Sequence, residues 1–168
     1  MKRIGILLLA LLCAAIGCAA PGRSETAVFV DPNAVKAGAY GDLYFTANGF
    51  DFGIYDPTET LLDHITPGST FAEQSCAFEG EDVYYFFSGF EVMANVIDGA
   101  ERVTMINLTD DTVKTPDGLS IGMPEADAAA LLGEPSVGGV YTSTAGTAIR
   151  TVTVQDGRIA AITYLPAE

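Results

Sequence analysis

Two stretches of this 168-residue chain share one order of apolar and polar positions. They read "GFDFGIYDPTETLLDHITP" at residues 49–67 and "GLSIGMPEADAAALLGEP" at residues 118–135. In each, a short apolar run between two glycines precedes a proline and then leucines at helical spacing. Proline is favoured in the first turn of a helix, where its missing N–H leaves nothing unsatisfied. Each stretch therefore predicts a short strand followed by a short helix.

The same stretches predict how the helices are capped and which residues they bury. Asp56 stands directly before Pro57 and three residues before Glu59, an order that predicts Asp56 as the helix N-cap. Gly133, followed by Pro135, is expected to end the second helix. The leucines of both helices are expected to face the core: Leu61, Leu62, Leu131 and Leu132.

Strand patterns follow each predicted helix. After the first helix and a polar connection, "DVYYFFSGFEVMANVI" and "ERVTMINLT" predict three strands, divided by Ser88-Gly89 and Asp98-Gly99. After the second helix, "GVYTS", "TAIRTVTV" and "RIAAITYL" predict three more. The sequence thus predicts an α+β fold of two tandem strand-helix-three-strand units, residues 41–110 and 111–168. The two units are expected to form one antiparallel sheet with short helices on one face.

Residues 1–17, "MKRIGILLLALLCAAIG", predict a signal peptide, because Lys2 and Arg3 precede an apolar run too short to span a bilayer. The following "AAIGC" resembles the lipobox of bacterial lipoproteins, in which a lipid is attached to the cysteine that follows the cleavage site. The resemblance implies that Cys18 anchors the protein to the extracytoplasmic side of a bacterial membrane, with residues 18–40 as a tether. The alternative is an ordinary secreted protein, cut after the small-x-small triplet that ends at Ala19.

The chain is strongly acidic, with a formal net charge of −14. Loss of Lys2 and Arg3 with the signal peptide would make this charge more negative by two. Such a surface repels phosphates, so no nucleic acid partner is expected. It suits an extracytoplasmic protein that meets basic or uncharged partners. The alternative is that the acidic charge serves solubility alone.

Residues for nucleophilic or zinc chemistry are scarce. Beside a lipidated Cys18, Cys76 would be the one cysteine of the mature domain, and it is expected to be a buried small apolar group. His64 is the single histidine and is expected at the edge of a helix rather than as a general base. Zinc sites draw on clusters of cysteine and histidine that this chain lacks. The sequence therefore predicts neither an enzyme of these classes nor a bound cofactor.

Carboxylates leave two other possibilities open. Asp51, between Phe50 and Phe52, has apolar neighbours of the kind that raise the pKa of a hydrolase carboxyl, but strand alternation would turn it into solvent. Calcium needs only oxygen ligands, although neither acidic loop has the spacing of an EF-hand. The residues of these loops are Asp110, Asp111 and Asp117, and Glu79, Glu81 and Asp82.

The aromatic run "VYYFFSGF" is the most informative functional feature. In a strand, Tyr84 and Phe86 point to one face, whereas Tyr85 and Phe87 point to the other. Because short helices cover one face of a sheet, one of the two pairs is expected to be accessible as a binding face for a protein or glycan. Tyr85 is the preferred contact residue, since its hydroxyl suits a wet boundary. The alternative is that both faces are covered.

Two wider resemblances bear on function. The helix that ends in "LLGEP" resembles the β-lactamase inhibitor protein-like fold and the small outer-membrane assembly lipoproteins, whose motif also reads as a glycine, a helix and "LLGxP". The segment from "SCAFEGEDVYYFFSGFEV" through "LTDDTVKTPDGLSIGM" is similar to a family of uncharacterised lipoproteins from Gram-positive gut bacteria. These resemblances imply a non-enzymatic extracytoplasmic role, commonly protein binding across the sheet face. The alternatives are a carboxylate-dependent hydrolase and a structural envelope-assembly factor.

The lipid anchor gives the first testable prediction. Wild-type protein is expected to partition into the detergent phase, and Cys18→Ala is expected to move it into the aqueous phase, because acyl chains supply the membrane affinity. Mass spectrometry of the mature N-terminus checks this directly. A mature protein that begins at Ala20 without a lipid adduct would contradict the prediction.

Overall fold

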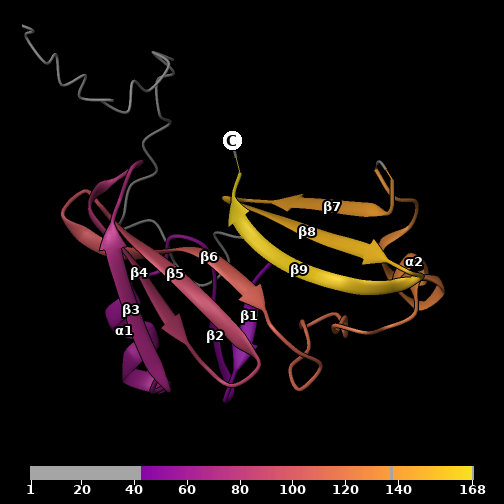
Figure 1. The fold of residues 1–168 in the computed structure, drawn as a ribbon, viewed down its shortest axis with the longest axis horizontal. Helices are drawn as coiled ribbons and strands as arrows, with labels where there is room; N and C mark the ends of the chain where they lie inside the picture. Colours follow the sequence, from indigo (N-terminus) through magenta and orange to yellow (C-terminus); the bar gives the residue numbers. More distant parts are fainter. Residues whose placement is uncertain (1–42, 137, 168) are drawn as a thin grey trace, which may run out of the picture.

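The computed structural model describes residues 43–136 and 138–167. The predicted signal peptide at 1–17, the lipidation site Cys18 and the tether at 18–40 lie outside these residues. Within the described part, the chain forms a two-stranded sheet and a seven-stranded sheet, with two short helices (Figure 1).

The elements follow one another as two strands, a helix, four strands, a helix and three strands. Their bounds are β1 Phe45–Ala47, β2 Phe50–Phe52, α1 Thr58–His64, β3 Ser69–Gln74, β4 Glu79–Phe86, β5 Phe90–Ile97, β6 Ala100–Leu108, α2 Glu125–Leu132, β7 Val140–Ala145, β8 Ala148–Gln155 and β9 Arg158–Pro166. Strands β1 and β2 pair with each other. The other seven lie in the order β3-β4-β5-β6-β9-β8-β7, and all neighbours are antiparallel.

The expected α+β arrangement is wrong, because the described chain is mostly β. Helix α1 has seven residues and α2 has eight, too few to cover a face of a seven-stranded sheet. The two-unit arrangement is wrong as well. Residues 69–74, read from the sequence as part of a polar connection, pair with β4 as an additional strand, and β1–β2 form a sheet of their own. The first part of the chain therefore supplies four strands to the large sheet and the second part three.

The tight turns are predicted correctly by local chemistry. Asp98-Gly99 joins β5 to β6, with φ angles of 53° and 76°, and Asp156-Gly157 joins β8 to β9, with φ angles of 52° and 71°. Positive φ at both central residues gives the turn twist that matches two antiparallel strands, and Asp-Gly tolerates it.

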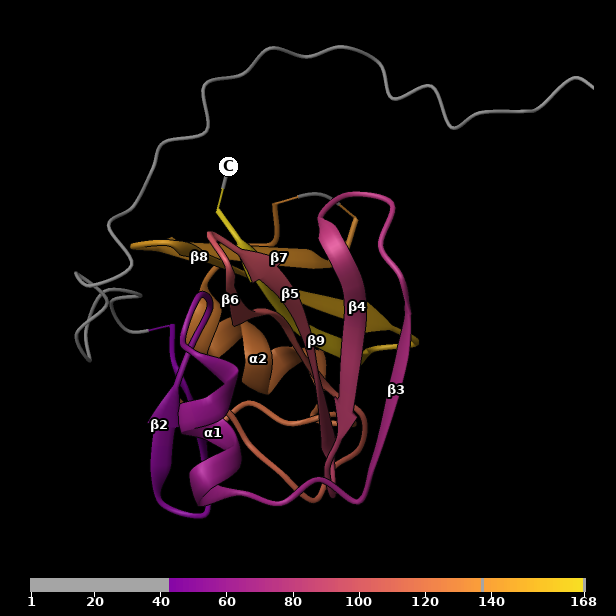
Figure 2. The ribbon, with the colours of Figure 1, turned by 90° about the vertical axis from the view of Figure 1, so that its left-hand side faces the viewer.

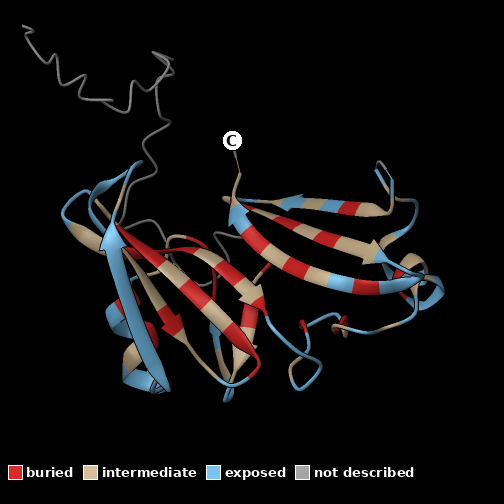
Figure 3. Cartoon of the chain, viewed as in Figure 1, coloured by how far each residue is buried: buried red, intermediate tan, exposed pale blue. Residues whose placement is uncertain are grey.

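The core lies on one face of the large sheet, where the small β1–β2 sheet packs against it. Alternate residues along the central strands are buried, as Figure 3 shows for β5, β6 and β9. Phe45 of β1 lies 5.0 Å from Phe90 of β5 between ring centroids, and Phe52 of β2 lies 6.2 Å from the same ring. Figure 2 shows β2 and α1 lying side by side, away from the free edge at β3. We call the face of the large sheet that packs against the β1–β2 sheet the core face.

The predicted cap and one predicted core leucine are wrong. Pro57 is the N-cap residue of α1, and Asp56 instead accepts a hydrogen bond from the Gly53 N–H (2.9 Å). Leu61 is fully buried, but Leu131 is 52% exposed. In α2 the side that packs on the core carries the fully buried Ala128 with Ala129 and Leu132 beside it, and Leu131 lies about 100° around the helix axis from the centre of that side. Leu131 therefore faces solvent.

These two leucines form a matched pair for a stability test. Leu61→Ala is expected to lower the free energy of unfolding by about 2 to 5 kcal/mol, because it leaves a cavity in the core. Leu131→Ala is expected to change it by less than about 0.5 kcal/mol, as at most exposed sites. Chemical denaturation of the two variants measures both values. Equal losses would contradict the packing of the helices described above.

Candidate functional site

The aromatic residues of β4 divide between the two faces of the sheet. Tyr85 pairs with the buried Val92 on the core face, whereas Tyr84 pairs with Met93 on the opposite face. We call this opposite face, away from β1–β2, the open face. The four residues Tyr84, Tyr85, Phe86 and Phe87 therefore do not make one binding surface.

The preference for Tyr85 as the exposed contact residue is wrong. Its side chain is only 9% exposed, and its hydroxyl donates a hydrogen bond to Glu101 (2.7 Å). Burial, followed by this hydrogen bond, raises the pKa of Tyr85. Phe87, on the same face, stacks on Phe90 at 4.7 Å between centroids. Both belong to the core, because the β1–β2 sheet covers this face.

On the open face, four side chains form a continuous cross-strand row. The register pairs Phe71 of β3 with Tyr84 of β4, Tyr84 with Met93 of β5, and Met93 with Met105 of β6. Phe71 is 52% exposed and lies 6.1 Å from Tyr84 between centroids. The ring of Phe86 stacks beside Tyr84 at 6.5 Å. We call Phe71, Tyr84, Met93 and Met105 the aromatic–methionine row.

Sequence reasoning identified Tyr84 and Phe86 but missed the rest of this row. Phe71 lies in a stretch that was read as a polar connection, and Met93 and Met105 are single residues within long apolar runs. Alternation along each strand could have placed them on one face. Predicting that these side chains lie next to one another would also have required the register between the strands, which no single segment of the sequence determines.

A polar row runs beside the aromatic–methionine row. Asn107 of β6 donates a hydrogen bond to Glu91 of β5 (2.9 Å) and accepts one from Thr163 of β9 (2.9 Å). Further threonines continue this face, since Thr163 pairs with Thr151 and Thr151 with Thr142 of β7. The open face therefore carries the aromatic–methionine row together with carboxylates over β3 to β6. Its other half, over β7 to β9, is mainly polar because of the threonines, with the apolar pair Ile149 and Leu165 at one end.

Carboxylates flank the aromatic–methionine row on both sides. Glu73 of β3 lies directly opposite Asp82 of β4 in the register, and Glu91 lies on the other side of the row. Burial, then the charges of Glu73, Asp82 and Glu91, and a side-chain hydrogen bond with Glu73 raise the pKa of Tyr84. Asp82 accepts a hydrogen bond from the buried Asn95 amide, whose oxygen in turn accepts one from the Thr104 hydroxyl.

The basic side chains of the described residues bond elsewhere. Arg102 donates to the Tyr55 carbonyl (3.0 Å), Arg158 to the Gly122 carbonyl (2.7 Å), and Arg150 pairs with Asp117. Lys114, the remaining cation of residues 43–167, lines a cavity near β1. None of these contacts reaches the carboxylates beside the aromatic–methionine row.

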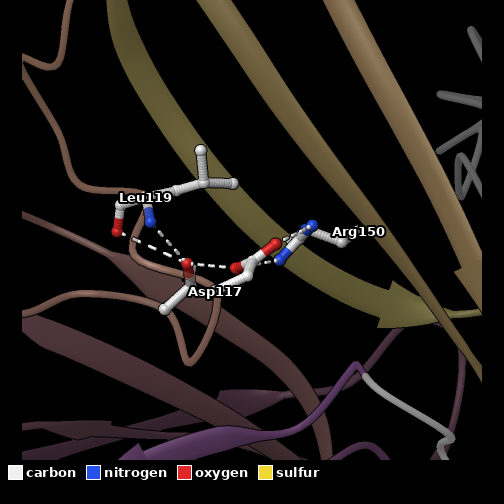
Figure 4. A network of polar contacts seen from close by, with 4 residues as sticks. Asp117, Leu119 and Arg150 are labelled. Atoms are coloured by element: carbon white, nitrogen blue, oxygen red, sulfur yellow. Dashed lines mark hydrogen bonds and ion pairs between the residues drawn. The ribbon is translucent and has the colours of Figure 1, made fainter. Parts of the chain in front are cut away.

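A polar cluster around Asp117 binds a loop to the core face. Asp117 accepts two hydrogen bonds from the guanidinium of Arg150, each 2.8 Å long, and a third from the Thr115 hydroxyl (2.6 Å) (Figure 4). The Thr115 hydroxyl also accepts one from the Leu119 N–H (2.9 Å). Burial alone would raise the pKa of Asp117, but the hydrogen bonds from Arg150 and Thr115 outweigh it and hold this pKa below its ordinary value. The cluster fastens residues 115–119 to β8.

Other residues singled out from the sequence lie apart from one another. Cys76 is exposed rather than buried, so that expectation is wrong. His64 stacks on Phe50 at 3.9 Å between centroids. Asp51 is exposed, as alternation predicts, and accepts a hydrogen bond from Thr46 (2.6 Å). Within residues 43–136 and 138–167, no three metal-ligating side chains gather into a group that could hold a metal ion.

A cavity of about 290 Å³ opens near the ends of β1 and β4. Its walls are apolar at Phe87, Phe90 and Val113 and polar at Asn48 and Lys114. No carboxylate lines it, which separates it from the paired-carboxylate sites that glycoside hydrolysis requires.

Comparison with protein-family models finds no matching family, and comparison with curated proteins finds no similar sequence. A solved structure that shows similarity is a 1.5 Å crystal structure of an extracellular protein containing a SCP domain from Bacillus anthracis str. Ames. The TM-score is 0.39 and the sequence identity 12%. The match covers 67% of this chain and 44% of that one, so this chain spans less than half of the other. A likeness at this level supports no conclusion about fold or function.

Neither of the two helices within residues 43–136 and 138–167 is long and apolar enough to cross a membrane.

The Asp117–Arg150 pair gives a prediction for the dependence of stability on pH. Because the folded pKa of Asp117 is lowered, its stabilising contribution is present above pH of about 4 and is lost as pH falls through the folded pKa. Asp117→Asn is therefore expected to lower the melting temperature at neutral pH and to reduce the loss on acidification. Asp127→Asn, at an exposed site in α2, is the control. If the melting temperatures of Asp117→Asn and wild type fall in parallel on acidification, the pair does not stabilise the fold.

Proposed function

We propose that this protein is a non-catalytic binding protein of the bacterial envelope, anchored by lipid on Cys18, that contacts a protein partner through its open face. The observation that carries this proposal is the accessible aromatic–methionine row across β3 to β6. The proposed contact surface keeps Tyr84 and Phe86 from the binding face expected from the sequence. Tyr85 and Phe87 are excluded from it by their place in the core.

The composition of the row supports a contact surface. The outer face of an antiparallel sheet with one covered side is ordinarily polar, as it is here along the threonines of β7, β8 and β9. Apolar side chains left on such a face mark interaction sites more often than scattered apolar residues do. Aromatic residues and methionine are also enriched at the centres of protein interfaces, since they provide a large contact area and adapt to a partner's shape.

The arrangement favours binding over hydrolysis. Glu73 and Asp82 face each other on the outside of the sheet, with nothing in the described chain that would enclose a substrate above them. The cavity beside β1 provides enclosure but no carboxylate among its lining residues. The paired carboxylates and the enclosed cavity that a carboxylate-dependent hydrolase requires therefore occur in different places.

Site-specific photo-crosslinking in cells tests the proposal. A benzophenone amino acid at position 71, at the exposed end of the row, is expected to give a discrete protein adduct that mass spectrometry identifies. The same amino acid at position 142 is the matched control, because Thr142 is exposed on the polar half of the same face. Tyr84→Ser is expected to reduce the adduct formed from position 71 while leaving the melting temperature nearly unchanged.

Two results would overturn the proposed function. One is the same pattern of adducts from positions 71 and 142, since the row would then have no preference over the polar half. The other is the absence of any discrete adduct from position 71 in cells in which the protein is correctly localised.

A further inference from the structure

We infer that the partner presents a cationic, extended segment that pairs with the free edge of β3 and places a basic side chain beside Glu73 and the neighbouring Asp82. The inference rests on the proposed function and adds the chemistry of the partner to it. It follows from three features of the described residues: a free edge strand, carboxylates to which no basic side chain of the described residues bonds, and an exposed ring beside them.

Strand β3 forms one edge of the seven-stranded sheet, and all six of its residues are exposed. Its register with β4 is unbroken from Ser69 opposite Phe86 to Gln74 opposite Glu81. Proteins usually protect such an edge with charged side chains, above all lysine, with proline or with a bulge, because unpaired backbone groups invite another strand. The sequence of β3, "STFAEQ", has no proline and no lysine, its pairing has no bulge, and its one charge is the acidic Glu73. The backbone of β3 is therefore suited to accept an added strand.

The carboxylates beside this edge favour a basic partner. Glu73 and Asp82 are directly opposite each other on the same face, an arrangement of like charges that destabilises a sheet. Asp82 is held in place by Asn95, so it is not free to turn away. None of the basic side chains of the described residues bonds to either carboxylate. A lysine or arginine from a partner would relieve this repulsion.

The aromatic ring of Phe71 supplies the apolar half of the same contact. Phe71 and Glu73 are two positions apart on β3, so they share the open face at a spacing of about 7 Å. An added strand has the same spacing between alternate side chains. It would therefore present a basic residue to Glu73 and an apolar residue to Phe71, and the stem of a lysine would lie along the rings.

Charge also selects against other occupants of this face. A second copy of the chain carries the same net charge of −14 and would place like charges against the carboxylates. Nucleic acid would be repelled for the same reason.

Peptide binding to the soluble protein, residues 19–168, provides the test. The probe is a fluorescent heptapeptide, Thr-Lys-Thr-Phe-Thr-Lys-Thr, and the comparison peptides replace both lysines with glutamate or the phenylalanine with serine. Fluorescence anisotropy at 0.15 M salt is expected to show binding of the first peptide and loss of binding for the other two. Glu73→Gln is expected to weaken binding about 2- to 5-fold, as for a partly exposed charge pair.

Two controls separate a specific site from general attraction to an acidic protein. Glu134→Gln removes the same charge from an exposed position outside the open face and is expected to leave binding unchanged. Amide hydrogen exchange is expected to slow in β3 on peptide binding but not in β7, the other edge of the same sheet. Phe71→Ser is expected to remove binding without changing the melting temperature, since the side chain is half exposed.

Several results would overturn the inference. These are equal effects of Glu73→Gln and Glu134→Gln, equal protection of β3 and β7, binding of the glutamate peptide, or dimers of the free protein that Phe71→Ser dissociates. No binding of the lysine peptide would also overturn it. If position 71 still crosslinks to a partner in cells in these cases, the proposed function stands and only the chemistry of the partner is wrong.

Discussion

The large sheet is continuous only because β6 pairs with β9. All other neighbours in the sheet follow one another in the sequence, so each half is a meander of local hairpins. The joint between the halves contains three residue pairs: Ile106 with Tyr164, Asn107 with Thr163, and Leu108 with Ile162. Pairing of residues more than fifty positions apart carries a loop-closure cost that local hairpins avoid. Side-chain contacts on both faces must offset this cost.

The core face provides most of that compensation. The ring of Tyr164 is fully buried, lies 6.4 Å from Phe45, and has the guanidinium of Arg150 5.9 Å from its centre. Strand β1, strand β8 and the loop held by Asp117 therefore all meet at this one strand pair. On the open face, the hydrogen bond from Thr163 to Asn107 spans the same joint. The packing of β1–β2 against the joint also determines which face of the sheet remains uncovered.

Local chemistry accounts for what could be predicted from the sequence. Asp98-Gly99 and Asp156-Gly157 specify their turns by themselves, and alternation correctly separates Tyr84 from Tyr85. Which of these tyrosines is buried depends on β1 and β2, two strands of only three residues that give little periodic signal. The Asp117–Arg150 pair joins residues 33 positions apart and has no sequence signature. The aromatic–methionine row likewise depends on register, a property of paired strands rather than of any one segment.

The distribution of charge bears on how the proposed site differs from the rest of an acidic surface. At physiological ionic strength, exposed charges are screened beyond about 8 Å, so the net charge of −14 brings basic partners toward the protein without selecting a face. Selection depends on charges that lie within a few ångströms of the contact. Arg150 is buried, where its charge is compensated by Asp117, and Arg102 and Arg158 bond to backbone carbonyls. Because these cations serve internal contacts, they leave the local field of the carboxylates around Phe71 and Tyr84 uncompensated, and in the proposed site the rings between these carboxylates would turn general attraction into a defined place of contact.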